Sequence, residues 1–292
     1  MFSRRIFISS LILLFLTASN SQCGWSATND AVQGSAVFNR IVSQSNSNNW
    51  RALPIGELMG QVAKQLEGTP YKSNSLDSSP DREVCTVNLD GLDCVTFFEN
   101  VLGFVRMIKK GERTQNDLVK QVTSTRYRGG IVGDYTSRLH YLSDWFYENE
   151  SKHVVKVLSD LPGAETLKCK IRFMSTHPAS YEQLVKYPNL VAKIKQQEDA
   201  INKRPVKFVP MSKMAAAEPL LQTGDIVAIC TTIPGLDVAH TGLVVRTADG
   251  VAHFMDASSK FRKVTLEAGS ISQYLSRNKT WTGAIFARPL EP

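Results

Sequence analysis

Hydrophobic and polar residues follow a helical period in two segments of the first half of the chain. From Ile55 to Glu67 the apolar side chains recur every three or four positions, and Gly68 can end this helix. A second helix is predicted to begin near Cys94. Its apolar stripe is wide, which indicates a helix buried on one side. The stripe consists of Phe97, Phe98, Val101, Leu102, Val105 and Ile108.

The last quarter of the chain has a different pattern, in which β-branched and apolar runs alternate with turn residues such as Gly224 and Asp249-Gly250. Strands are predicted at 225–230, 240–247, 251–257, 263–266 and 284–287. Weaker patterns predict a helix at 135–148, a strand at 168–174 and a polar helix at 181–201. Helices followed by clustered strands predict an α+β fold with a β-rich C-terminal part.

The first 21 residues have the pattern of a secretory signal peptide. Arg4 and Arg5 precede an apolar run over residues 6–16, and small or polar residues follow up to Ser21. The run is too short to span a bilayer comfortably, so no stable membrane insertion is expected after cleavage. The protein is therefore expected to be exported to the periplasm, and secretion from the cell is an alternative. A lipid anchor on Cys23 is a further alternative.

The domain organisation predicted from these patterns is simple. Residues 22–54, which contain a polar tract of low complexity, are predicted as a mature N-terminal linker. Residues 55–292 are predicted as one catalytic domain, with a mixed insertion at about 150–215.

Composition narrows the function classes. With 42% hydrophobic and 21% charged residues, the 292-residue chain is typical of a globular protein. The net charge of +7 is spread along the sequence, which indicates a solvated basic surface and no nucleic-acid partner. Export permits disulfides, but five cysteines are an odd number, so at least one is unpaired, lipidated or bonded to another chain.

Cys94 lies where the turn-rich segment 88–93 meets the second helix. The positive end of a helix stabilises a thiolate, which is the nucleophilic form of cysteine. This position therefore suits the nucleophile of a cysteine hydrolase. A buried structural cysteine, or a disulfide with Cys85, fits the position equally well.

A thiolate nucleophile needs a base, and His240 is the candidate because Gly242 leaves space beside its imidazole on a predicted strand. The alternative is a histidine that only packs on the sheet. A three-residue loop over residues 248–250 would place Asp256 opposite Gly242, one diagonal step from His240 and on the same face. His253 would point to the other face. Asp256 is therefore predicted to orient the imidazole, although a two-residue loop would turn it away.

Metal-dependent chemistry is disfavoured by the motifs. The sequence has no C-x-x-C, H-x-x-x-H or H-E-x-x-H spacing, no phosphate-cradling glycine loop and no G-x-S-x-G elbow. Neither a metal nor another cofactor is therefore expected.

Several segments in order resemble the bacterial N-acetylmuramoyl-L-alanine amidase-like family, within the NlpC-type, papain-like cell-wall hydrolases. The segments are GTPY at 68–71, VNLDGLDCVTFFENVL at 87–102, RYRGG at 126–130, SRLHY at 137–141, DW at 144–145, FMSTHP at 173–178, GDIVA at 224–228, PGLDVAHTGLVVR at 234–246 and DASSK at 256–260. Together they cover most of residues 55–290. The resemblance implies a papain-like core, with the nucleophile starting a buried helix that packs on an antiparallel sheet.

The same resemblance assigns roles to individual residues. Cys94 matches the nucleophile, His240 the base and Tyr71 a tyrosine kept near the nucleophile, in the position of an oxyanion donor. The third polar position is more often histidine in relatives, whereas Asp256 occupies it here. Candidate substrate contacts in family motifs are Asp93, Arg138, His140, Ser175 and His177. Structural hydrogen bonding is the alternative role for these last residues.

The function implied is cleavage of the amide between N-acetylmuramic acid and L-alanine in peptidoglycan or muropeptides, through a thioester. The catalytic residues do not separate this activity from that of a stem-peptide endopeptidase of the same fold. The same residues also fit a non-catalytic module that binds cell-wall fragments, or an enzyme that transfers an acyl group onto a host target.

Overall fold

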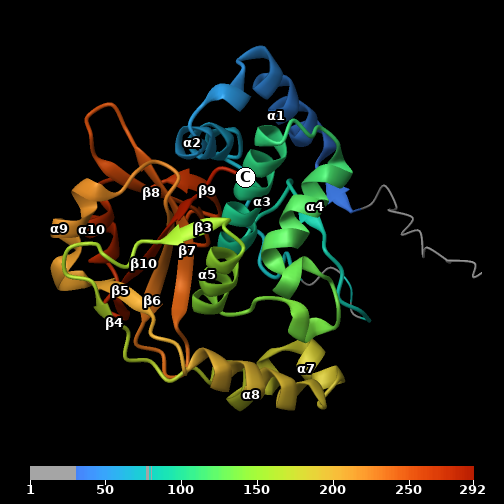
Figure 1. Cartoon of the computed structure of the whole chain (residues 1–292), viewed down its shortest axis with the longest axis vertical. Coiled ribbons are helices and arrows are strands. Elements are labelled where there is room, and N and C mark those ends of the chain that lie inside the picture. The colour runs from blue at the N-terminus through green and yellow to red at the C-terminus, as the bar shows by residue number, and fades with distance from the viewer. Residues whose placement is uncertain (1–30, 77–78, 80) are drawn as a thin grey trace, which may run out of the picture.

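The computed structural model describes residues 31–76, 79 and 81–292. The predicted signal peptide and Cys23 lie outside the described residues. Figure 1 shows a sheet on one side of the molecule and a group of helices on the other, with the C-terminus close to α2 and α3. The helices are α1 (Ser35–Ser47), α2 (Ile55–Gln65), α3 (Cys94–Lys109), α4 (Gln115–Arg126), α5 (Leu142–Ser151), α6 (Phe173–Thr176), α7 (Glu182–Lys186), α8 (Leu190–Ile201), α9 (Met214–Ala217) and α10 (Ile271–Leu275).

The main sheet is antiparallel and runs in the order β4-β5-β10-β6-β7-β8-β9, with β3 added beside β10. Its strands are β3 (Val155–Val157), β4 (Glu165–Thr166), β5 (Lys207–Pro210), β6 (Ile226–Thr231), β7 (Val238–Arg246), β8 (Ala252–Ser258), β9 (Lys263–Leu266) and β10 (Trp281–Pro289). A separate pair joins β1 (Val32–Gln33) to β2 (Val87–Asn88). The antiparallel C-terminal sheet predicted from the sequence is therefore present.

The centre of the sheet is buried on both faces. Along β6, Ile226 and Ala228 pack in the core shared with α3, whereas Val227 and Ile229 pack in a second core with α10. This alternation follows from the two-residue period of a strand. It explains why β6 reads as a continuous apolar run, and it fixes the face on which each β7 and β8 side chain emerges.

Helix α3 is the central helix of the other layer and packs against α2, α4, β7 and β8 (Figure 1). Its wide apolar stripe is fully buried, as the hydrophobic pattern predicts. One buried carboxylate joins three helices: Arg126 of α4 forms an ion pair with Glu99 of α3 at 2.6 Å, and the indole N–H of Trp145 of α5 donates to the same carboxylate. The first turns of α3 are thereby held against α4 and α5.

The segment predicted as a linker is folded over its described part. Residues 35–47 form α1, whose Phe38 and Ile41 are buried in the main core, and Trp50 is buried in the turn that follows. Most of the polar residues that suggested a linker are exposed on this helix or just after it, whereas Ser45 is buried. The linker prediction is therefore corrected for residues 31–54.

The mixed region also differs from its predicted elements. Residues 168–172 form no strand; this segment leads into α6, which begins at Phe173. The predicted helix over 181–201 is divided into α7 and α8, because Pro188 interrupts the helical hydrogen bonds between them. The helix predicted at 135–148 begins later, at Leu142.

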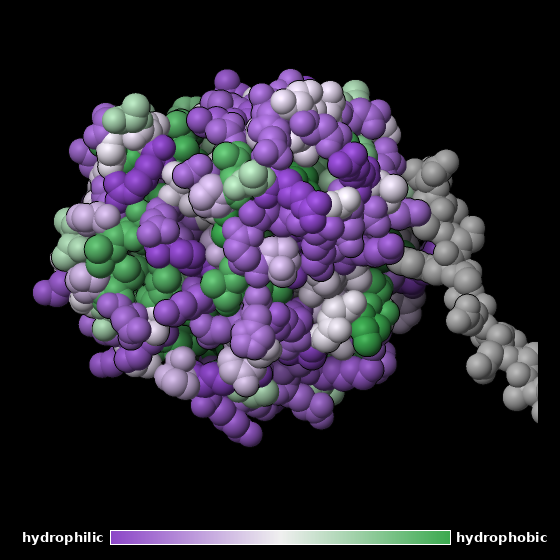
Figure 2. All heavy atoms as spheres, turned by 45° about the horizontal axis from the view of Figure 1, so that its top comes forward, coloured by the Kyte–Doolittle hydropathy of each residue, from purple (hydrophilic) through white to green (hydrophobic). Residues whose placement is uncertain are grey.

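No helix in the described ranges is long and apolar enough to cross a membrane. On the face drawn in Figure 2 the surface is hydrophilic over most of its area, and hydrophobic residues show in separate areas.

Candidate active site

Cys94 is the first residue of α3, and the start of this helix is tightly fixed. Asp93 caps it: its carboxylate accepts from the backbone N–H of Thr96 at 2.8 Å, while the Thr96 hydroxyl accepts from the Asp93 backbone N–H at 3.0 Å. The second Asp93 oxygen accepts from the Ser75 hydroxyl at 2.7 Å. The capping box thus orients the Cys94 side chain and ties the loop before the helix to its first turn.

His240 and Asp256 meet because of the hairpin register. The loop has three residues, Gly250 is left-handed with φ of 79°, and Leu243 pairs with Met255. This register is the one predicted from the sequence. The Nε2 atom of His240 lies 2.6 Å from Oδ2 of Asp256, whose side chain has no solvent exposure.

The electrostatics of His240 are dominated by its two polar neighbours. Burial by itself lowers the pKa of the imidazole, but hydrogen bonds to Asp256 and Cys94, together with their negative charges, raise it to about 10. The imidazole therefore carries a positive charge beside the Cys94 sulfur at neutral pH. Because Nε2 is bonded to Asp256, Nδ1 is the ring nitrogen left to exchange a proton with the sulfur.

Tyr71 completes the group around the sulfur. The backbone N–H of Tyr71 donates to the carbonyl of Arg262. The Tyr71 backbone also forms a parallel β-bridge with Leu92, just before α3. Burial, and then the charges of Cys94 and Asp93, raise the pKa of its phenol, so the hydroxyl keeps its proton. The structure therefore brings together Tyr71, Asp93, Cys94, His240 and Asp256.

Arg138 and His140 are engaged elsewhere. The buried guanidinium of Arg138 bonds both carboxylate oxygens of Glu83, at 2.9 and 2.8 Å. His140 bonds the carbonyl of Tyr135 at 2.8 Å, and burial followed by the charge of Arg138 lowers its pKa to about 3. These contacts support structural hydrogen bonding as the role of both residues.

Ser175 and His177 lie on α6 and just after it. The Ser175 backbone N–H donates to Glu198 of α8 at 2.9 Å. The imidazole of His177 is exposed and stacks on Phe173, with ring centroids 4.4 Å apart. Ser175 and His177 therefore make these contacts within the mixed region, to α8 and α6 respectively.

A cavity of about 520 Å³ opens beside His240. Lys260, from the DASSK motif, lines it together with three residues that no sequence pattern singles out, Tyr274, Arg277 and Trp281. Trp281 lies nearly parallel to the imidazole, with an interplanar angle of 12° and centroids 6.2 Å apart. No local motif marks Trp281, because it reaches His240 only through the sheet order that puts β10 beside β6 and β6 beside β7.

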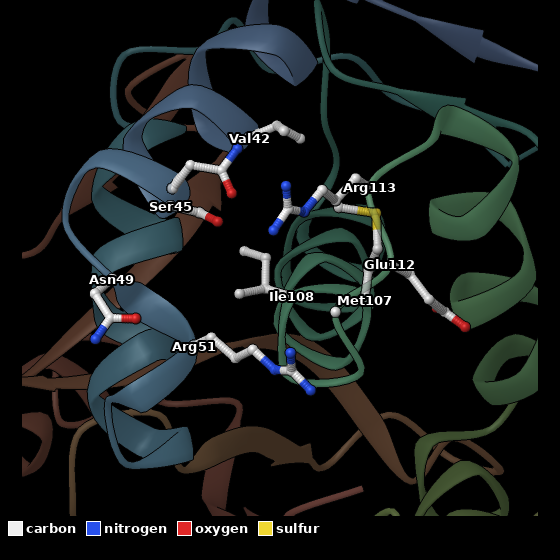
Figure 3. Close-up of a pocket in the computed structure, with 10 residues that line it drawn as sticks. Val42, Ser45, Asn49, Arg51, Met107, Ile108, Glu112 and Arg113 are labelled. Carbon is white, nitrogen blue, oxygen red and sulfur yellow. The ribbon is translucent and has the colours of Figure 1, made fainter.

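A second cavity, of about 240 Å³, lies at the opposite end of α3. Figure 3 shows it between α1 and the end of α3, with Arg113 reaching across it toward Ser45. Met107 and Ile108 of α3 line it, which places this cavity about 20 Å from Cys94 along the helix axis. It is therefore separate from the site around His240.

The four cysteines within the described residues are free. Cys85 is buried, with its sulfur 3.9 Å from a guanidinium nitrogen of Arg126, and burial raises the pKa of its thiol. Cys94 is therefore not held in a disulfide with Cys85. No three His, Cys, Asp or Glu side chains in this part of the chain converge as metal ligands.

Comparisons with known proteins agree on a family. The family model described as AmiA-like, N-acetylmuramoyl-L-alanine amidase-like, matches residues 61–283. The chain is similar to the crystal structure of an N-acetylmuramoyl-L-alanine amidase from Bacteroides uniformis ATCC 8492, with 33% identity and a TM-score of 0.73, covering 80% of this chain and 98% of that one.

Two further structures share the fold. A proposed xylanase from Bacteroides fragilis is 33% identical with a TM-score of 0.71, covering 77% of this chain and 98% of that one. A Legionella pneumophila protein is 18% identical with a TM-score of 0.67, covering 88% and 95%, and at this identity it shows the fold alone. A search of curated proteins gives no match. The chain belongs to the AmiA-like, N-acetylmuramoyl-L-alanine amidase-like family.

Proposed function

We propose that the protein is an exported cysteine amidase that cleaves the bond between N-acetylmuramic acid and L-alanine of peptidoglycan fragments. The observation that carries this proposal is the line of three side chains, with Cys94 at the start of α3, His240 beside it and Asp256 behind the imidazole. Family membership supports the choice of bond. The nucleophile on a helix packed against an antiparallel sheet fits an NlpC-type, papain-like core.

The chemistry follows from the positions of these groups. The Cys94 thiolate attacks the lactyl carbonyl carbon, and the carbonyl oxygen becomes an oxyanion. Helix geometry leaves the N–H of Cys94 without an acceptor inside α3, so this group and the Tyr71 hydroxyl can stabilise the oxyanion.

Collapse of the intermediate breaks the C–N bond, and His240 gives its proton to the leaving amine of alanine. The neutral imidazole then takes a proton from water, which attacks the thioester and releases the muramic acid carboxylate and the thiolate. Asp256 keeps the imidazole oriented and stabilises its charged form through both steps.

The test is product analysis with purified muropeptides. The wild type should release intact stem peptides and free muramic sugars, which mass spectrometry identifies. A stem-peptide endopeptidase would instead give fragments cut within the stem. Cys94→Ala should release nothing, whereas Cys169→Ala, the matched removal of another half-buried free cysteine, should keep wild-type activity. Wild-type hydrolysis by Cys94→Ala would overturn the nucleophile assignment.

Alkylation separates the enzyme from a non-catalytic binding module. An activated Cys94 should react with iodoacetamide at neutral pH faster than Cys169. A module that only binds cell-wall fragments predicts that Cys94 resists the reagent and that no bond is cleaved. Export is tested separately, by locating the protein in fractionated cells.

A further inference from the structure

The cavity beside His240 is built from the end of β8 and the turn after it, from α10 and the residues that follow, and from the start of β10. His240 is the one member of the proposed catalytic group that lines it. In the proposed reaction this imidazole gives its proton to the leaving amine, so the cavity next to it faces the leaving group. The leaving group is the stem peptide.

Two cationic side chains reach this cavity, Lys260 and Arg277. Arg277 ion-pairs with the buried Glu267 at 3.2 Å and also donates to the carbonyl of Ala268. Lys260 is exposed and, among the residues that the structure describes, has no ion-pair partner. Two cations against the single carboxylate of Glu267 leave the lining net positive, before the charge of His240 is added.

Two aromatic side chains, Tyr274 and Trp281, form part of the cavity wall, beside polar residues such as Ser258, Asn278 and Thr280. Trp281 contacts Tyr274, with centroids 5.3 Å apart, and Tyr274 stacks on the buried ring of Phe254 at 4.7 Å. On the side that these two rings cover, a bound carboxylate is shielded from water, which strengthens its attraction to the cations. The walls therefore favour a ligand that pairs with the cations.

The two sides of the scissile bond differ in charge. On the glycan side, the lactyl carboxyl is consumed in the amide and the sugars carry neutral acetamido groups. On the peptide side, the stem keeps free carboxylates. A net-positive cavity on the leaving-group side thus complements the peptide and has no counterpart in the sugar.

We propose that this cavity is the stem-peptide subsite, and that Lys260 and Arg277 make the enzyme select stems with a free carboxylate over stems in which that group is a primary amide. This selectivity rests on the proposed amidase function and adds to it the class of stem that is recognised. A charge-assisted hydrogen bond contributes enough to change kcat/KM by about 10- to 100-fold.

The experiment uses two synthetic muropeptides that differ only at the second stem residue, which carries either its free carboxylate or the primary amide. The wild type should cleave the acid with a kcat/KM at least about 10-fold higher. Lys260→Gln should lose most of this preference by raising KM for the acid, while activity on the amide stays. Arg277→Lys, which keeps the ion pair with Glu267, should reduce the preference further when combined with Lys260→Gln.

Lys279→Gln is the matched control. This lysine is exposed and lies between two residues that line the cavity, but it does not line the cavity itself, so its removal should leave the preference unchanged. Equal cleavage of acid and amide by the wild type would overturn the inference. A Lys260→Gln enzyme that loses activity equally on both substrates would also overturn it, and would point to a sugar in the cavity.

Failure of the proposed reaction gives a different result. If the wild type cleaves neither substrate, calorimetric binding of the two stem peptides to Cys94→Ala still tests the subsite. Tighter binding of the acid, lost in Lys260→Gln, would support the subsite without the amidase activity. Equal binding of both peptides would overturn it.

Discussion

Nε2 of His240 lies 2.6 Å from Oδ2 of Asp256, and the carboxylate that makes this contact is completely buried. A buried carboxylate that bonds one cationic partner fixes the orientation of that partner and stabilises its charged form. The two residues come from adjacent strands of a single hairpin, so the contact is fixed by the register of β7 and β8.

Asp256→Asn tests the charge of this pair while keeping its shape. The amide can still accept from Nε2, but it no longer stabilises the imidazolium, so kcat/KM should fall by about 10²- to 10⁴-fold. The pKa of His240, followed by NMR, should drop from its raised value near 10. Asp160→Asn, which changes an exposed carboxylate, is the control. An unchanged pKa in Asp256→Asn would contradict the role given to this carboxylate.

The raised pKa of His240 also predicts how stability depends on pH. The folded protein keeps the imidazole protonated up to about pH 10, whereas the unfolded chain releases that proton near the ordinary value of 6.5. Between these values the folded state binds more protons. This contribution to the free energy of unfolding is therefore complete below about pH 6.5 and is lost as the pH rises toward 10.

Urea titrations at several pH values measure this dependence. The wild type should lose stability between about pH 6.5 and 10, and His240→Gln should show a flatter profile over the same window. The difference between the two profiles isolates the histidine, because all other titrating groups are shared. Parallel profiles would mean that His240 is not protonated in the folded state.

Tyr71→Phe tests the second oxyanion donor. Because the raised pKa keeps its phenol protonated, the hydroxyl can donate to a developing oxyanion. Removing one such donor typically lowers kcat by about 10²- to 10³-fold with little change in KM. Tyr147→Phe, at an exposed site, should have wild-type kinetics. Equal rates for Tyr71→Phe and the wild type would remove Tyr71 from the site.

Asp93→Ala tests whether the helix cap serves catalysis as well as stability. Loss of the cap should cost about 0.5–2 kcal/mol of unfolding free energy. Thr114→Ala removes the equivalent capping box of α4 and should cost a similar amount. Only Asp93→Ala should also lower kcat, because its cap and its bond to Ser75 orient the first turn that carries Cys94. Similar kcat values for the two variants would make the Asp93 cap purely structural.

Local patterns are sufficient to predict the elements that carry this site. The helical period locates α3 with Cys94 at its start, and the turn residues indicate the three-residue loop that brings Asp256 to His240. Both features depend on residues close together in the sequence, where spacing determines geometry.

Features that depend on distant contacts do not follow from local patterns. Trp281 reaches His240 only because β10 inserts beside β6, and strand order does not follow from the pattern of any one strand. The sequence predicts Arg138 as a substrate contact because it lies in a family motif. In the structure Arg138 is buried and hydrogen-bonded to Glu83. In both cases the missing information is the packing partner.

Helix α1 is the clearest such correction, and it can be tested by substitution. Phe38 is 4% exposed and packs against Phe104 of α3, with ring centroids 5.6 Å apart. Replacing a buried phenylalanine by alanine typically costs about 3–5 kcal/mol. Phe38→Ala should therefore lower the urea midpoint strongly, whereas Asn39→Ala, on the exposed face of the same helix, should change it little. A linker would tolerate both substitutions equally, so equal midpoints would show that α1 does not contribute to the core in solution.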